Sequence, residues 1–243
     1  MRFIDLKKLE VSYENYPFPH TVIDNLLNED ILQDILSDIH SLNNKDANQS
    51  FLKDNGCEYN KLGFNKNYPP LLNKLFVELN SEQFIKAIEK LTNITNLICN
   101  DLSLKGAGIH RILNNGYLQF HTDFNTYYKN NVKRDKKIHL DRRINLLLYM
   151  NPEWKDEYNG HLMLCDKDKK QCVKKILPIL NRCVIFNTTN RSIHGHPKPL
   201  NVPPGIERNS IAIYYYTKND RDGVDFEGDK PHSTIWYKNI KDL

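Results

Sequence analysis

The sequence predicts an α+β protein, in which helices near the N-terminus pack on one face of a β sandwich or barrel. Before residue 100, apolar residues recur every three or four positions, as in amphipathic helices. After residue 100, they fall in short runs rich in β-branched and aromatic residues, separated by turn clusters. The chain has no internal repeat and no Pro/Gly/Ser-rich linker, so we expect a single domain over residues 1–243.

Two helices are predicted in the N-terminal part, residues 1 to about 100. In residues 21–40, apolar positions recur at helical spacing from Asn28 onward, and asparagine is a favoured N-cap. Ser81 is a second N-cap candidate, ahead of apolar positions that continue to Leu91. Each helix therefore has one apolar face that a sheet could bury.

Seven strands are predicted after residue 100. Turn clusters such as Asn114-Asn115-Gly116, Asn159-Gly160 and Pro203-Pro204-Gly205 separate them. Short strands at this spacing are typical of sandwiches and barrels. The apolar runs are 109–113, 117–120, 144–150, 161–165, 173–180, 183–186 and 211–217. The basic interval 129–143 interrupts them, and we expect a solvent-exposed loop there or a lid beside the site.

The overall charge excludes few functions. The 243 residues include 34 Lys plus Arg and 30 Asp plus Glu, a net charge of +4, which is too balanced to indicate a nucleic-acid or membrane-surface binder. No apolar stretch approaches the roughly 18 residues of a membrane span, and the first ten residues are too charged for a signal peptide. We expect a cytoplasmic protein. Its five cysteines lack a CxxC pair, which favours reduced thiols over a disulfide framework or a zinc ribbon.

A candidate metal site is spread over two segments. His121 and Asp123 are two residues apart, so in a strand their side chains would share a face. With a distant histidine, for which His194 is the candidate, they would form the facial triad of non-haem Fe(II) oxygenases. His139 and Asp141 form a second HxD motif. We favour the first, because the second lies in the basic interval and not at the end of a predicted strand.

A candidate anion site follows the distant histidine. An oxo-acid cosubstrate binds such iron through its oxo-carboxylate end, and its far carboxylate needs a buried cation, for which the arginine fork is well suited. Arg208 and Ser210 lie two apart at the head of a predicted strand, shortly after His194. They would therefore project to one face and could supply the cation and a hydroxyl.

Several segments together resemble one protein family, the prolyl 4-hydroxylase-like branch of the 2-oxoglutarate/Fe(II)-dependent dioxygenases. The resemblance covers roughly residues 100–220, and residues 17–39 are similar to the N-terminal strand and helix of that branch. The segments that carry it are GYLQFHTDF at 116–124, RRINLLLYMNPEW at 142–154, GHLML at 160–164, NRCVIFNTTNRSIHGHPKPL at 181–200 and PGIERNSIAIYYYT at 204–217.

This resemblance implies a double-stranded β-helix, a cupin-like jelly roll, with a catalytic core at about 100–220 and a C-terminal extension at 221–243. It implies that Fe(II) is bound by His121, Asp123 and His194. It further implies that the distal carboxylate of 2-oxoglutarate is held by Arg208 with help from Tyr149 and Ser210, and that His110 is a polar neighbour of the cosubstrate.

The implied reaction is the hydroxylation of a C–H bond by O2, with decarboxylation of 2-oxoglutarate to succinate and CO2. Ascorbate is a candidate additional cofactor. The resemblance favours a prolyl residue of a peptide or protein as substrate, with the 129–143 interval and residues 232–237 as walls.

Other readings of the sequence stay open. The substrate could be a free amino acid, a sugar or another small metabolite, because one jelly roll serves many substrates. A non-enzymatic jelly-roll binding module and a zinc hydrolase are alternatives from other classes. Nucleic-acid demethylases of the superfamily resemble a pattern with a second arginine where this chain has Tyr214, and halogenases lack the carboxylate that Asp123 supplies. The sequence predicts no oligomeric state.

Overall fold

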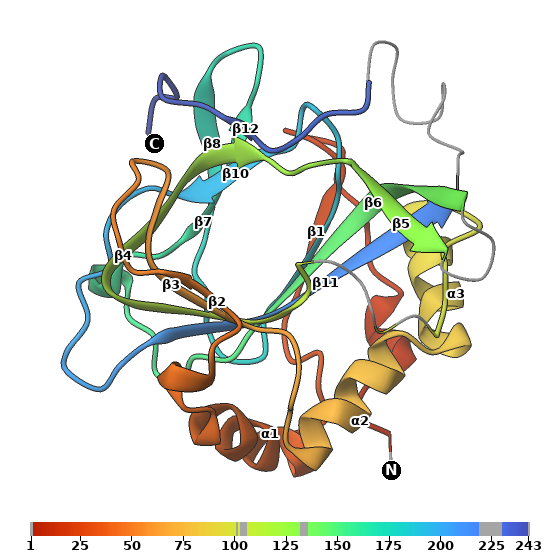
Figure 1. The fold of residues 1–243 in the computed structure, drawn as a ribbon, viewed down its shortest axis with the longest axis horizontal. Coiled ribbons are helices and arrows are strands. Elements are labelled where there is room, and N and C mark those ends of the chain that lie inside the picture. The colour runs from red at the N-terminus through yellow and green to blue at the C-terminus, as the bar shows by residue number, and fades with distance from the viewer. Residues whose placement is uncertain (1, 101, 103–105, 132–135, 219–229, 243) are drawn as a thin grey trace.

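The computed structural model describes residues 2–100, 102, 106–131, 136–218 and 230–242. Its strands form one strongly curled antiparallel sheet with three helices against its outside (Figure 1). Along the main path the strand order is β1-β9-β6-β11-β4-β10-β7-β8. The predicted α+β class, mainly β with packed helices, is confirmed.

The helices are α1 (Glu29–Ser41), α2 (Pro70–Leu79) and α3 (Glu82–Thr92). The strands of the first hundred residues are β1 (His20–Ile23), β2 (Gln49–Phe51) and β3 (Glu58–Phe64). The later strands are β4 (Gly108–Thr122), β5 (Thr126–Asn131), β6 (Lys136–Tyr149), β7 (Leu162–Asp166), β8 (Gln171–Ile176), β9 (Cys183–Asn187), β10 (Ile193–His196), β11 (Arg208–Lys218) and β12 (Ile235–Trp236).

Two of the three helices begin where the capping residues predict. Asn28 precedes α1, and the Ser81 side chain accepts a hydrogen bond from the Phe84 backbone at the start of α3. The sequence reasoning missed α2, which starts at the Pro69-Pro70 pair. Proline fits the first helical position because the amide hydrogen that it lacks would have no partner there.

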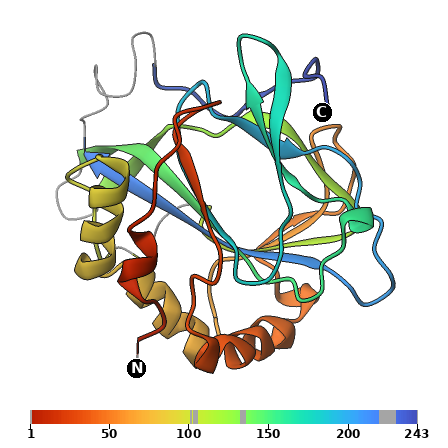
Figure 2. The same cartoon turned by 180° about the vertical axis from the view of Figure 1, so that it is seen from behind.

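The helices cover one face of the β1-β9-β6-β11-β4 half of the sheet, as predicted (Figures 1 and 2). Along β6, Ile144, Leu146 and Leu148 belong to the core shared with the helices, whereas Tyr149 belongs to a separate cluster inside the curl. This period of two follows from the alternation of side chains along a strand. It leaves the inward face of β6 free to build a site.

The N-terminal part contributes strands as well as helices. β1 pairs with β9, and β3 pairs with β4, so both complete the sheet that residues 100–220 form. The two apolar runs predicted before and after Asn114-Asn115-Gly116 are a single strand, β4, whose pairing with β3 is irregular between Ile112 and Tyr117. The organisation of residues 1–243 as a single domain stays a prediction.

The expectation of a loop over 129–143 is wrong. β5 and β6 pair antiparallel, with Thr126 opposite Asp141, and only residues 132–135 lie outside the described part. The charged sequence was misleading because Arg142 and Arg143 are buried, each with 1% exposure. Arg142 is neutralised by an ion pair with Asp123.

One cysteine pair also differs from expectation. Cys165 and Cys172 form a disulfide between β7 and β8, because the register of that hairpin places the two residues opposite each other. Cys57, Cys99 and Cys183 are free thiols. None of the helices described has the length and apolar composition needed to cross a membrane.

Candidate functional site

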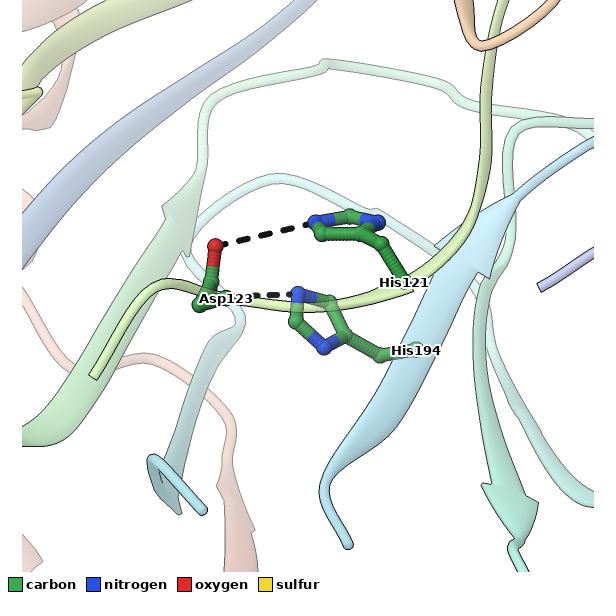
Figure 3. Close-up of side chains that lie close together, drawn as sticks. All are labelled: His121, Asp123 and His194. Carbon is green, nitrogen blue, oxygen red and sulfur yellow. Dashed lines mark ion pairs between the residues drawn. The ribbon is translucent and has the colours of Figure 1, made fainter. Parts of the chain in front are cut away.

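The three predicted metal ligands meet inside the curled sheet (Figure 3). His121 lies near the end of β4, directly opposite His194 of β10, and Asp123 follows just after β4. The Nε2 atoms of His121 and His194 are 3.7 and 3.5 Å from the Asp123 carboxylate oxygens. Within the described residues, this is the only group of three or more His, Cys, Asp or Glu side chains close enough to share a metal ion.

Backbone carbonyl groups orient the imidazole rings of His121 and His194. The Nδ1 atom of His121 is 2.8 Å from the Gln119 carbonyl oxygen, and that of His194 is 2.9 Å from the Ser192 carbonyl oxygen. Donation from Nδ1 to these carbonyls leaves each Nε2 lone pair facing Asp123. Burial lowers the pKa of His194 to about 4, so its ring is neutral near pH 7 and able to accept a cation.

Gly195 lets the two ligand strands approach each other. A Cβ atom at this position would lie 2.8 Å from the Gln119 carbonyl oxygen and 3.0 Å from that of Leu118. Any other residue would push β10 away from β4. The small residue between His194 and His196 therefore keeps His194 opposite His121.

Two side chains of β6 hold the Asp123 carboxylate. Arg142 Nη2 and Asn145 Nδ2 each donate a hydrogen bond of 2.8 Å to Asp123 Oδ2. Burial disfavours the charged carboxylate, but attraction to Arg142 and the neighbouring imidazoles outweighs it and lowers the pKa of Asp123. The Arg142 guanidinium also lies 3.4 Å from the centre of the Tyr214 ring, which fixes its plane.

An irregularity in the sheet explains why Arg142 and Asn145 both face Asp123. They are three apart, so in a regular strand they would point to opposite faces. The pairing of β6 with β11 skips Arg143, since Tyr215 lies opposite Ile144 and Tyr216 opposite Arg142. This bulge turns Arg142 inward.

The metal-ligand group lines one side of a cavity of about 90 Å3, and Arg208 lines another. Arg208 is only 5% exposed, and its Nε donates a 2.8 Å hydrogen bond to the Gly160 carbonyl oxygen. Its guanidinium lies 4.9 Å from the Tyr149 ring centre. No carboxylate of the described residues pairs with it, so Arg208 is a buried cation without a protein counter-ion.

Tyr149, Ser210 and His110 line the same cavity. Ser210 of β11 lies opposite Tyr149 on one side and His110 on the other, so the three are neighbours across the sheet. The buried Tyr149 hydroxyl has no hydrogen-bond partner among the described residues. Burial and the nearby Lys61 ammonium lower the pKa of His110 to about 3, so it is neutral near pH 7.

Residues 107–216 match the model of the 2OG-Fe(II) oxygenase superfamily. The chain carries a 2OG-Fe(II) oxygenase domain. The matched segment includes His121, Asp123, His194 and Arg208, and the predicted resemblance is confirmed. No curated protein matches the chain in sequence.

Solved structures share the fold of the oxygenase domain. A prolyl 4-hydroxylase from Phytophthora capsici has a TM-score of 0.57 at 16% identity, over 93% of this chain and 65% of its own, so the chain spans about two-thirds of that enzyme. A Trichoplax adhaerens prolyl hydroxylase, in complex with a peptide fragment of the hypoxia inducible factor oxygen degradation domain, scores 0.55 at 17% identity over 88% and 87% of the two chains.

A third neighbour, HygX from Streptomyces hygroscopicus with nickel, 2-oxoglutarate and hygromycin B bound, scores 0.51 at 11% identity over 89% and 93% of the two chains. At such identities the likeness concerns the fold alone. The predicted jelly roll, or double-stranded β-helix, is confirmed by it.

The second HxD motif of the oxygenase domain does not form such a site. His139 and Asp141 lie within β6, with His139 Nε2 3.5 Å from Asp141 Oδ1. No third ligand joins them within the described residues. The sequence argument favours His121 and Asp123 because the second motif is not expected at the end of a strand. In the structure, the second motif lies within the long strand β6.

The sequence reasoning missed Arg142, Asn145 and Lys61. Arg142 was counted with the basic interval, although the apolar run that follows it signals a buried strand. Lys61 reaches the cavity from β3, which has no clear alternation in the sequence.

The C-terminal part of the described chain lies beside the ligands. Trp236 of β12 is opposite His121 of β4, and their ring centres are 5.1 Å apart. Asn125, two residues after Asp123, fastens this segment through hydrogen bonds to the Lys230 carbonyl oxygen and from the His232 amide.

Proposed function

We propose that this chain is an Fe(II)- and 2-oxoglutarate-dependent dioxygenase that hydroxylates a C–H bond, with a prolyl residue of a peptide or protein as the first candidate substrate. The observation that carries the proposal is one cavity with two unlike ends. At one end lie His121, Asp123 and His194, and at the other lies Arg208 without a counter-ion. The superfamily match supports the same reaction class.

The donor chemistry of the first end fits Fe(II). Two imidazoles and one carboxylate, all buried, form the 2-His-1-carboxylate set that leaves coordination positions open on non-haem iron. The Nδ1 hydrogen bonds of His121 and His194 supply the orientation that metal-binding imidazoles need. We propose these three residues as the iron ligands.

The second end fits the distal carboxylate of 2-oxoglutarate. A buried guanidinium without a counter-ion is costly unless an anion compensates its charge. Arg208 is such a group, and the unpartnered Tyr149 hydroxyl beside it could donate to the same anion. Ser210 and His110 are proposed as polar neighbours on the same wall.

Bound Fe(II) and 2-oxoglutarate would supply O2 activation and oxidative decarboxylation to succinate and CO2. The residues of the chain would supply position and shelter. Arg142 and Asn145 keep the Asp123 carboxylate charged and immobile. Leu147 and Leu162 line the cavity between its two ends and exclude water from the reacting centre.

Two of the similar solved structures bear on the choice of substrate. The Trichoplax adhaerens protein holds a peptide fragment, which supports a peptide or protein substrate, and HygX holds hygromycin B, which keeps a small metabolite as the alternative. The proximity of Trp236 to His121 supports residues 232–237 as a wall. Ascorbate dependence and a cytoplasmic location stay predictions.

A non-enzymatic jelly-roll module is the rival from another class. Such a module needs neither a metal-ligand triad nor a buried arginine that lacks a counter-ion. The described part of this chain has both in one cavity. A zinc hydrolase has no need for the arginine.

The test is succinate formation by the iron-loaded protein with 2-oxoglutarate and O2, first without substrate and then with prolyl peptides and metabolites. We expect slow uncoupled turnover and, with the true substrate, a gain of one oxygen atom by mass spectrometry. Absence of succinate under all conditions, in protein that binds the metal, would refute the proposal.

A further inference from the structure

A groove beside the metal centre has an apolar floor and a basic rim. Its cavity of about 360 Å3 is lined by residues of the β7–β8 turn, the start of β10 and the C-terminal segment that contains β12. Figure 1 shows where β7, β8, β10 and β12 lie in the fold. The floor includes Ile193, Trp236 and Ile240, and the rim carries Lys167, Lys170 and Lys238. We call these six residues the lysine groove.

The lysine groove adjoins the proposed iron ligands on both sides. Ile193 precedes His194 in β10, and the Trp236 ring lies 5.1 Å from the His121 ring. A bound chain lying in the groove would therefore pass within a few residues of the proposed metal centre.

The three rim lysines have no carboxylate partner among the described residues. Lys167 donates a 3.3 Å hydrogen bond to the neutral Asn190 side chain. The nearby carboxylates are engaged elsewhere, because Asp166 faces Lys169 at 3.8 Å and Asp168 pairs with Arg191. No acidic residue of the described part lines the cavity. Within that part, the groove therefore presents uncompensated positive charge around an apolar floor.

The groove is held in shape by backbone contacts. Lys241 N donates to the Lys170 carbonyl oxygen at 2.9 Å, and Cys172 N donates to the Lys241 carbonyl oxygen at 2.9 Å. Nearer the metal centre, Tyr237 N donates to the Phe120 carbonyl oxygen at 2.8 Å. The C-terminal segment is thus fastened at both ends, which makes a preformed surface and lowers the entropic cost of binding.

We infer that the lysine groove binds an acidic segment of the peptide substrate, next to the residue that enters the catalytic cavity. Positive charge at a rim selects partners of opposite charge and speeds their encounter, and an apolar floor supplies contact area for aliphatic or aromatic side chains between the acids. This inference rests on the proposed hydroxylase function and narrows its substrate to an acidic peptide.

Trp236 provides a local probe of the groove. The chain has only two tryptophans, and Trp154 lies in a different cluster, packed on Tyr158. In the Trp154→Phe protein, Trp236 is the only tryptophan, so the tryptophan fluorescence comes from the groove. The probe ligands are a Glu-rich peptide containing one proline, and peptides of equal length in which every Glu is replaced by Gln or by Lys.

We expect the Glu-rich peptide to change Trp236 fluorescence saturably, and its affinity to fall by about tenfold or more between low and high salt because exposed charges are screened. The triple variant K167E/K170E/K238E should weaken binding by at least about tenfold. The matched control K7E/K45E/K74E changes the net charge equally at exposed lysines of the N-terminal helical part and should bind like the parent protein. Circular dichroism and thermal unfolding establish that both variants are folded.

Equal responses to the Glu-rich and Gln-rich peptides, or equal weakening in the two triple variants, would overturn the inference. The measurement needs no turnover, so its outcome is separate from that of the proposed function. Groove binding without any succinate formation would contradict the oxygenase activity, whereas succinate formation without groove binding would contradict the acidic substrate.

Discussion

The two ends of the cavity differ in how the charge of their buried groups is balanced. At the metal end, the Asp123 carboxylate is already neutralised by Arg142 and held by Asn145, so its position is fixed before any ligand arrives. At the other end, Arg208 is also buried but has no anionic partner among the residues that the structure describes. The comparison teaches that the charge at the metal end is balanced within the protein, whereas the charge of Arg208 leaves room for an anion, which we propose to be the cosubstrate.

The largest expected effect is at the metal end. Asp123→Ala removes the only carboxylate of the proposed ligand set, so succinate formation should fall by at least about 100-fold, because positioned metal ligands cannot be replaced by solvent. His161→Ala is a control, since His161 pairs with Asp156 outside the ligand set. Retained 2-oxoglutarate turnover in the Asp123→Ala protein would show that the metal lies elsewhere.

Removal of Arg208 should act on the cosubstrate. Arg208→Met is expected to raise the KM for 2-oxoglutarate by about 10- to 100-fold, because a charge-assisted bidentate contact is lost. Metal affinity should change little, and Arg191→Met, which breaks a surface pair with Asp168, is the matched control. An unchanged KM would remove Arg208 from the cosubstrate site.

Thermal unfolding without ligands compares the two arginines directly. Arg142→Met leaves Asp123 without its main counter-charge and should cost about 3 kcal/mol of unfolding free energy. Arg208→Met removes a buried cation that has no counter-ion, and should be neutral or stabilising. The comparison of the two ends fails if Arg208→Met destabilises the ligand-free protein as strongly as Arg142→Met does.

Gly195→Ala should separate the ligand strands. The added methyl group meets backbone carbonyls of β4, and overpacking of this kind costs about 1–3 kcal/mol. We expect weaker metal binding by calorimetry, with a smaller effect from Gly63→Ala, whose added methyl meets only the Gln49 side chain. Equal metal affinities in the two variants would contradict the proposed role of Gly195.

The last effect, which is the smallest at pH 7, concerns pH. The pKa of His110 is about 3 in the folded protein, below its unfolded value near 6.5, so its contribution to stability is present above pH 6.5 and is lost as pH falls below that value. The slope is at most about 1.4 kcal/mol per pH unit. Denaturant unfolding from pH 7 to 4 should show a shallower pH dependence in His110→Asn. Superimposable pH profiles would contradict the burial of a neutral ring.

Local rules predicted much of the fold and the candidate site. Asn28 and Ser81 marked two helix starts, and of the two only the Ser81 side chain makes a capping hydrogen bond, which it accepts from the Phe84 amide. The period of two placed His121 with Asp123, and Arg208 with Ser210, before any contact between segments was known.

The remainder depends on long-range pairing. The inward turn of Arg142 comes from a bulge against β11, and the approach of Lys61 comes from the pairing of β3 with β4. The opposed cysteines Cys165 and Cys172 follow from the register of a hairpin. None of these pairings has a signal within the segment concerned, because register is set by the partner strand.

The most direct test of the central claim is an anaerobic titration of the protein with Fe(II) and 2-oxoglutarate, followed by visible absorption. The cavity with its two ends predicts a weak charge-transfer band that appears only when both are present, is absent in Asp123→Ala, and needs much more 2-oxoglutarate in Arg208→Met. A folded protein that gives no band at any concentration of the two would contradict the account.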